Sequence, residues 1–182
     1  MKPRLLCILA LGFVAASDHR SGDAVEYHFD HSYALIAVTE MRAFIELRAY
    51  EHDAILDSKV LSSRYMPPDF EVKDVLLGDD PEFILRTRDG GTGIGETHLA
   101  VYGVVGRHIR RFGDFVVERH AQSWPETEYR EELSGKVSFP KKNELVYRYN
   151  QVLTRHGKGV TNSVTQLYSF NPKKLKYEQK RP

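Results

Sequence analysis

The stretch from Asp79 to Phe112, DDPEFILRTRDGGTGIGETHLAVYGVVGRHIRRF, decides the fold class. Between Phe83 and Arg88, a two-residue period sets Phe83 and Leu85 on the side opposite Ile84, Arg86 and Arg88. The segment from Thr97 to Val105 is rich in β-branched and aromatic residues. Glycine-rich turn sequences separate these pieces. A two-residue period broken by turns is typical of half-buried strands joined as hairpins. The stretch therefore predicts antiparallel β-structure.

The same rhythm extends through most of the chain. It recurs from Met41 to Tyr50, where helix remains an alternative because the segment Thr39 to His52 contains many good helix formers. It returns at 144–154 and 163–170, on either side of a glycine-containing turn. The short links leave no room for parallel crossovers. We therefore predict an all-β fold of antiparallel meanders, arranged as a sandwich or a partial propeller-like stack of sheets.

The first 17 residues have the parts of a secretory signal peptide. Two basic residues precede an apolar run of about ten residues, Leu5 to Val14, and small residues follow it. The run is too short for a membrane span, which needs about 20 apolar residues. We expect cleavage after Ala16 or Ser17. Residues 18–182 would then form a single all-β domain, periplasmic or secreted, without a membrane span.

Two proline-containing connectors are candidate seams between halves of this domain. The first lies near 64–70 and contains Pro67-Pro68, and the second lies near 122–127 and contains Trp124-Pro125. Proline cannot occupy a helix interior or a central strand, so each segment reads as a link between elements. A two-part organisation with a seam at either place is therefore possible.

The net charge and the cysteine content argue against several classes of function. Loss of Lys2 and Arg4 with the leader reduces 26 basic residues to 24, against 25 acidic ones, a net charge of −1. A nearly neutral body lacks the basic surface that nucleic-acid binding requires. The only cysteine, Cys7, lies in the leader. We therefore expect no nucleic-acid partner, no disulfide, no thiol nucleophile and no cofactor.

One segment resembles a repeat unit of exported bacterial proteins. The unit comprises Leu77-Gly-Asp-Asp-Pro-Glu-Phe and Arg88-Asp-Gly-Gly-Thr-Gly, followed by a strand of the Thr-His-Leu-x-Val-Tyr kind. It is similar to units of the FG-GAP and VCBS repeat proteins and covers Val75 to Phe112. The resemblance implies an exported, repeat-like β-protein and implies no activity. The calcium loop of those repeats is reduced here to Asp79, Asp80 and Glu82, interrupted by Pro81.

The glycine-rich segment at 90–95 has two interpretations. It does not predict a dinucleotide site, because that site needs a helix after the glycines and a strand is expected here. One interpretation is a mobile hairpin loop that uses the conformational freedom of glycine. The other is a ligand-contacting loop on which four polar side chains converge. These candidate ligand-binding residues are Asp89, Thr92, Glu96 and His98.

Aromatic residues are concentrated in the C-terminal meander, among basic ones. They could form an exposed face rich in tyrosine and arginine that binds a protein or a saccharide. Alternatively, the rings could pack in the core with their hydroxyl groups at its rim. The aromatic residues are Tyr147, Tyr149, Tyr168, Phe170 and Tyr177, and the basic ones are Arg148, Lys173, Lys174 and Lys176.

The sequence predicts an exported, non-enzymatic binding or structural domain of the bacterial envelope or extracellular space. A protein or saccharide of the cell envelope is the expected partner. We assign no catalytic residue, because a Gly-x-Ser-x-Gly motif is missing and carboxylate pairs converge only in three dimensions. We assign no metal site, because three converging ligands cannot be identified. The alternatives are a hydrolase acting on an envelope or extracellular polymer and a calcium-supported β-repeat module.

Overall fold

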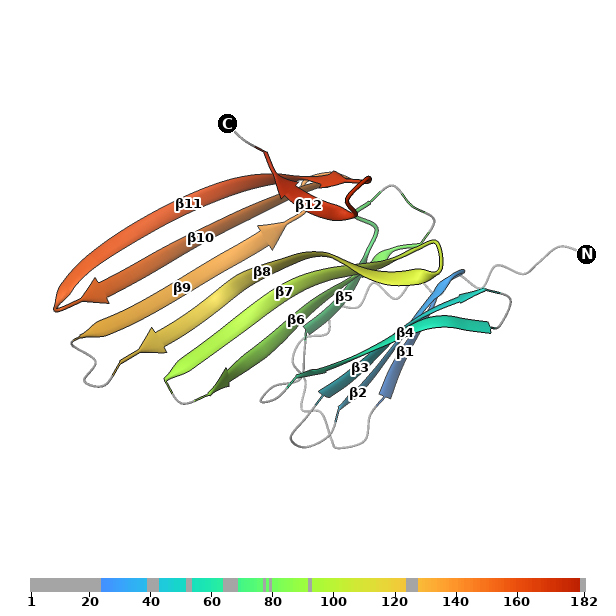
Figure 1. Ribbon diagram of the computed structural model, residues 1–182, viewed down its shortest axis with the longest axis horizontal. Helices are drawn as coiled ribbons and strands as arrows, with labels where there is room; N and C mark the ends of the chain where they lie inside the picture. The colour runs from blue at the N-terminus through green and yellow to red at the C-terminus, as the bar shows by residue number, and fades with distance from the viewer. Residues whose placement is uncertain are drawn as a thin grey trace, which may run out of the picture.

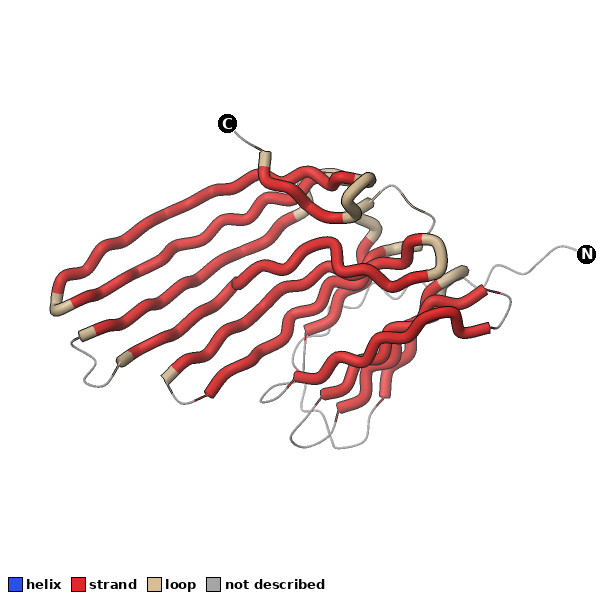
Figure 2. The backbone as a smooth tube through the Cα atoms, in the orientation of Figure 1, coloured by secondary structure: helices blue, strands red, loops and turns tan. Residues whose placement is uncertain are grey.

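The protein is described by a computed structural model that covers residues 24–38, 43–51, 54–63, 69–76, 78, 80–91, 93–123 and 128–180. These residues form twelve strands in two antiparallel sheets and no helix, which confirms the predicted all-β class (Figure 1, Figure 2). The described part of the chain accordingly has no helix long and apolar enough to cross a membrane. The predicted signal peptide, residues 1–17, lies outside the described residues.

The chain builds the smaller sheet first and the larger sheet second. The four-stranded sheet has the order β1-β2-β3-β4, with strands Ala24–His28, Ser32–Val38, Ala43–Glu51 and Ala54–Ser63. The eight-stranded sheet runs in chain order from β5 at one edge to β12 at the other. Its strands are Asp69–Lys73, Glu82–Gly91, Ile94–Val105, His108–Gln122, Tyr129–Ser138, Glu144–Arg155, Lys158–Asn171 and Lys176–Gln179.

The segment that was ambiguous between strand and helix is strand β3. Ile45 and Leu47 are fully buried, whereas Phe44, which precedes them, is exposed and Glu46, which lies between them, is partly exposed. Alternating burial is what a strand with one covered face requires. The two-residue period therefore outweighed the helix propensity of the individual residues.

Strands β6, β7 and β8 form a layer that is buried on both faces. Phe83 and Leu85 of β6 join a hydrophobic cluster with the four-stranded sheet, whereas Ile84 between them joins a second cluster. In β7, Ala100 and Val101 divide between the two clusters in the same way. Because successive side chains of a strand point to opposite faces, each of these strands contributes to both cores.

Polar contacts hold the β7–β8 hairpin against the four-stranded sheet. Oδ2 of Asp57 accepts a hydrogen bond of 2.9 Å from the backbone N–H of Ile109. This hydrogen bond is the main reason that the pKa of Asp57 lies below its ordinary value. The Nζ of Lys59 lies 5.3 Å from the ring centre of Tyr102, within the range of a cation–π contact.

Strand β8 is longer than the sequence pattern indicates. Gly113 and Asp114 separate the apolar segments 109–112 and 115–117 in the sequence, but both segments belong to one strand of 15 residues. Its register against β7 shifts at Thr97/His98 and again at Val101/Tyr102. At each irregularity, the residues of β8 that face the core change from one alternating set to the other. A strict two-residue pattern in the sequence therefore does not continue through the whole strand.

The larger sheet bends over itself where β8 leaves β9. These two strands pair only between Glu118–Gln122 and Arg130–Ser134. Beyond that point, Phe115 of β8 packs in one cluster with Tyr147 of β10 and Tyr177 of β12. Figure 1 shows β12 lying across the end of the sheet, next to the curved end of β8. The second core therefore lies between two parts of a single sheet.

The two predicted seams have different structural surroundings. The change from one sheet to the other falls between Ser63 and Asp69, with residues 64–68 outside the described part. The segment 122–127 separates β8 from β9, which are neighbours in one sheet, and its residues 124–127 are also outside the described part. The division of the chain into domains stays a prediction.

Substituting Gly103 with alanine should destabilise the fold. A Cβ atom at this position would lie 2.5 Å from Cε2 of Phe112, a ring that is buried in the second core. Overpacking of this kind lowers the free energy of unfolding by about 1–3 kcal/mol, which urea denaturation would measure. Gly91→Ala is the matched control, because a Cβ at that position meets no atom within 4 Å. Equal stabilities of the two variants would contradict this account of the core.

Candidate functional site

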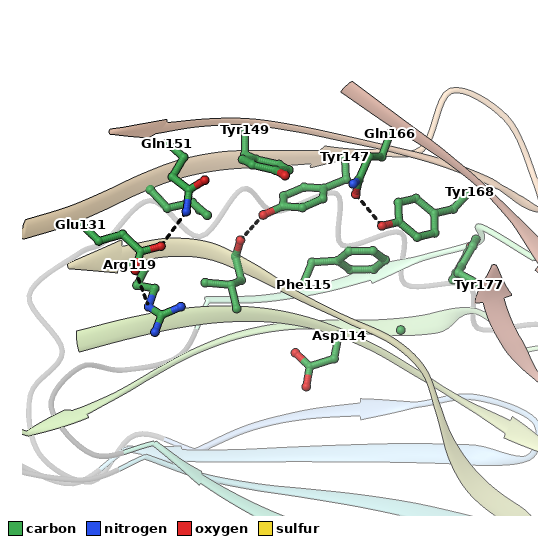
Figure 3. A pocket seen from close by; sticks show the side chains of 13 residues that line it. Asp114, Phe115, Arg119, Glu131, Tyr147, Tyr149, Gln151, Gln166, Tyr168 and Tyr177 are labelled. Atoms are coloured by element: carbon green, nitrogen blue, oxygen red, sulfur yellow. Dashed lines mark hydrogen bonds and ion pairs between the residues drawn. The ribbon is translucent and has the colours of Figure 1, made fainter. Parts of the chain in front are cut away.

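A cavity of about 410 Å³ opens where β8 separates from β9. Its volume lies within the usual range for small-molecule sites, about 300–1,000 Å³. Strands β8 to β12 all contribute to its lining. The side chains that line it and carry rings or polar groups are Asp114, Phe115, Arg119, Glu131, Tyr147, Tyr149, Gln151, Gln166, Tyr168 and Tyr177 (Figure 3).

Strand register gathers the lining residues of β9 and β10 on one face. Gly135 of β9 lies opposite Tyr149 of β10, and Leu133 lies opposite Gln151. Alternate residues of a strand share a face, so Tyr147 joins them. A Cβ at Gly135 would lie 2.9 Å from Cε2 of Tyr147. Glycine at this position therefore leaves the space that the Tyr147 ring occupies.

Four aromatic rings in mutual contact form one wall of the cavity. The ring centres of Tyr147 and Tyr149 are 5.0 Å apart in a stacked arrangement, and Phe115 lies 5.6 Å from Tyr147. Phe115 also meets Tyr168 edge-on at 5.2 Å. The Tyr147 hydroxyl donates a hydrogen bond to the backbone carbonyl of Val116. Burial raises the pKa of Tyr147 to about 12, so this hydroxyl is a fixed donor at neutral pH.

The structure distinguishes between the two interpretations of the aromatic residues in the C-terminal meander. Tyr147 and Tyr177 are buried in the second core, and Tyr149, Tyr168 and Phe170 pack against it while partly exposed. Arg148 is exposed and lies between Tyr147 and Tyr149 in the strand, so it points to the opposite face of the sheet. The arrangement matches the alternative interpretation, with rings in the core and hydroxyl groups at its rim.

The polar wall of the cavity is organised around Glu131. This carboxylate is only 6% exposed and accepts hydrogen bonds from the Tyr129 hydroxyl at 2.5 Å and from Nε2 of Gln151 at 2.7 Å. The Tyr129 hydrogen bond is the largest cause that lowers the pKa of Glu131, and Arg119 adds a favourable charge. Glu131 is therefore held ionised at the wall of the cavity.

Arg119 lies between two carboxylates. Its Nε is 3.1 Å from Oε1 of Glu96 and 3.6 Å from Oε2 of Glu131. Neither contact has hydrogen-bond geometry, so among the described residues this buried Nε atom has charge partners but no hydrogen-bond acceptor. The guanidinium group therefore adds an under-used donor to the polar wall.

The structure brings two of the four predicted ligand-binding residues together. Nε2 of His98 lies 3.1 Å from Oε2 of Glu96, and Nδ1 of His98 lies 3.1 Å from Oδ1 of Asp114. Asp89 lies opposite Glu96 in the register of β6 and β7, but it is exposed and accepts a hydrogen bond from the backbone N–H of Gly90. Thr92 lies outside the described residues.

Asp89 belongs to a different hollow from the one described above. The tips of β6 and β7 border an open depression of about 720 Å³, which Asp89 lines together with His120 and several glycines. Glu96 and His98 do not line it. Gly93 has a φ of 84°, a conformation that favours glycine and closes the turn between the two strands. Asp89 therefore does not share one space with Glu96 and His98.

A chain of ionisable side chains links Glu96 and His98 to the cavity. It continues from His98 and Glu96 to Arg119 and then to Glu131. Sequence analysis missed Arg119, Glu131 and Gln151, because they come from three strands that are adjacent only in the folded sheet. Glu131 lies two residues from Leu133 and so points to the same face of β9. A carboxylate at a position where the strand pattern expects an apolar side chain was the one sequence signal that could have identified Glu131 as a site residue.

Comparisons with models of known families, with curated proteins and with solved structures gave no match. The resemblance to FG-GAP and VCBS units therefore stays a prediction. The two described carboxylates of the reduced calcium loop bind backbone N–H groups: Asp80 accepts from His31, and Glu82 accepts from Val75 and Leu76. The class that fold and site define is an all-β protein with an aromatic cavity inside a bent sheet.

Replacing Glu131 with glutamine should change how stability depends on pH. Because folding lowers the pKa of Glu131 below 4.5, its ionised form stabilises the fold fully above pH 4.5, and this contribution is lost as the pH falls through the folded pKa. Glu131→Gln lacks this contribution at every pH. Urea unfolding should therefore show the larger gap between wild type and variant at pH 6 and a smaller gap at pH 3. A gap that does not vary with pH would contradict the assignment.

Proposed function

We propose that this chain is an exported, non-enzymatic binding domain whose ligand is a saccharide of the bacterial envelope or extracellular space. The cavity between β8 and β10 is the binding site in this proposal. Export rests on the predicted leader at residues 1–17, whereas the choice of ligand rests on the chemistry of the cavity wall.

The observation that carries the proposal is that stacked aromatic rings and fixed hydrogen-bonding groups line the same cavity. A sugar ring has apolar C–H faces and a rim of hydroxyl groups that both donate and accept. The partly exposed ring of Tyr149 offers an aromatic surface, already backed by Tyr147 at 5.0 Å. Gln151 and Glu131 lie on the neighbouring register positions and supply the polar contacts.

The hydroxyl of Tyr149 also suits a ligand of this kind. The neighbouring hydroxyls are committed, since Tyr147 donates to Val116 and Tyr168 donates to Gln166 at 2.7 Å. No hydrogen bond joins the Tyr149 hydroxyl to another described residue. The group is therefore available to a hydroxylated ligand, and it lies next to the aromatic surface that would hold the ring.

The state of Glu131 supports binding over hydrolysis. A glycosidase needs a carboxylic acid whose raised pKa lets it protonate the leaving group. Glu131 has the opposite tuning, because Tyr129 and Gln151 occupy both of its oxygen atoms and lower its pKa. Such a carboxylate acts as a preorganised acceptor, a role that orients a ligand without transferring a proton.

Titration calorimetry with short oligosaccharides tests the proposal. The probes are oligomers of N-acetylglucosamine and neutral gluco-oligosaccharides of two to four units. We expect wild type to bind at least one of them and Tyr149→Ala to weaken binding at least about tenfold, because the aromatic surface is lost.

Arg148→Ala is the matched control, since it alters the adjacent residue of β10 on the opposite face of the sheet. It should bind as the wild type does. The proposal fails if wild type binds none of the probes at millimolar concentration, or if Tyr149→Ala and Arg148→Ala weaken binding equally.

A further inference from the structure

One long strand edge of the larger sheet is open. Strand β11 pairs with β10 from Lys158 to Ser169, but β12 pairs only with residues 168–171 of β11. The last contact on that side is a hydrogen bond of 2.8 Å from the backbone N–H of Lys180 to the carbonyl of Leu167. The part of β11 from Lys158 to Gln166 therefore has no strand on its outer side among the described residues.

The direction of the backbone groups along this edge follows from the Lys180 contact. Because the carbonyl of Leu167 points away from β10, the two-residue period directs the N–H and C=O groups of alternate residues outward too. No register shift interrupts the pairing of β10 with β11, so this alternation holds along the edge. The outward-facing residues are Gly159, Thr161, Ser163 and Thr165.

This edge lacks the features that usually block strand pairing. Proteins protect long edges with charged residues, proline, bulges or a covering segment. Between Gly159 and Gln166 the strand has no charged residue and no proline, and its pairing with β10 is regular. Val160, at 57% exposed, leaves an apolar side chain on this edge. Another strand could therefore form backbone hydrogen bonds with this edge.

We propose that two copies of this chain pair antiparallel through this edge, about a two-fold axis at Asn162. In this register Val160 of one copy lies opposite Val164 of the second copy, so the exposed valine gains an apolar neighbour. Thr161 lies opposite Ser163, and the two Asn162 side chains face each other across the axis. Such cross-strand pairs are the favourable kind in antiparallel sheets.

The ends of the paired segment also fit. Lys158, the one charged residue of the segment, lies opposite Gln166 of the second copy, so no like charges meet. One end of the open edge is the turn at Gly157, and the other is the Lys180 contact, so the two strands overlap along nine residues without meeting β12. An interface in which each copy offers the same surface closes on itself as a dimer.

In the dimer, the larger sheets of the two copies form one continuous sheet, and the same face of each copy lies on the same side of it. A two-fold axis that makes antiparallel neighbours within a sheet runs perpendicular to that sheet. Both cavities would therefore open on the same side. This consequence matters for ligand binding only if the proposed function holds, in which case a polymeric saccharide could engage both copies. The pairing itself does not depend on what the cavity binds.

Sedimentation equilibrium of the purified chain tests the pairing. We expect wild type to have twice the mass of one chain at micromolar concentration. Asn162→Lys places two positive charges opposite each other at about 4.5 Å between Cα atoms, and Asn162→Asp does the same with negative charges, so each variant alone should be monomeric. A mixture of the two variants should recover the dimer, because lysine then faces aspartate.

A third variant distinguishes loss of pairing from loss of folding. Thr161→Pro removes an N–H that points to the open edge and not to β10, so the thermal melt should remain cooperative while the dimer is lost. The proposal is overturned if wild type is monomeric up to about 100 μM. It is also overturned if Thr161→Pro or both Asn162 variants remain dimeric, or if mixing the Lys and Asp variants leaves them monomeric.

Discussion

The structure depends on the burial of strands β6 to β8 on both faces. The run Phe83-Ile84-Leu85 sends alternate side chains into two separate clusters, so this layer organises the four-stranded sheet on one side and the curved end of the larger sheet on the other. Glu82 fixes the start of the layer, because one of its oxygen atoms accepts the backbone N–H groups of Val75 and Leu76. Burial raises the pKa of this carboxyl, and the two backbone donors offset part of that cost.

The cavity is a consequence of this double burial. β8 stays paired with β7 from His108 to Ala121, whereas it stays paired with β9 only as far as Glu118 and Ser134. The space that opens between them is lined by rings whose other surfaces belong to the core. Tyr147 illustrates both roles, since its ring packs in the second cluster while its edge borders the cavity. Binding and packing are therefore performed by the same side chains.

Local patterns predicted some elements well and others poorly. The alternation around Ile45 and Leu47 correctly indicated strand over helix, because one face of β3 is covered and the other is not. The same rule does not describe β8, because its register shifts against β7 move residues from one face of the strand to the other. Glu96 and His98 were correctly placed near each other, being two residues apart on one strand. Their connection to Glu131 through Arg119 crosses three strands and has no signature in the order of residues.

The amino-acid sequence alone determined the all-β class, the antiparallel pairing and most strand positions, because side-chain alternation and turn residues act over a few neighbouring positions. Tertiary structure alone decided that the chain divides into a sheet of four strands and a sheet of eight, that the larger sheet bends, and that the tyrosines of its C-terminal strands surround a cavity. These features depend on contacts between residues far apart in the chain. Such contacts are fixed by how whole faces of the sheets fit together, which no local period encodes.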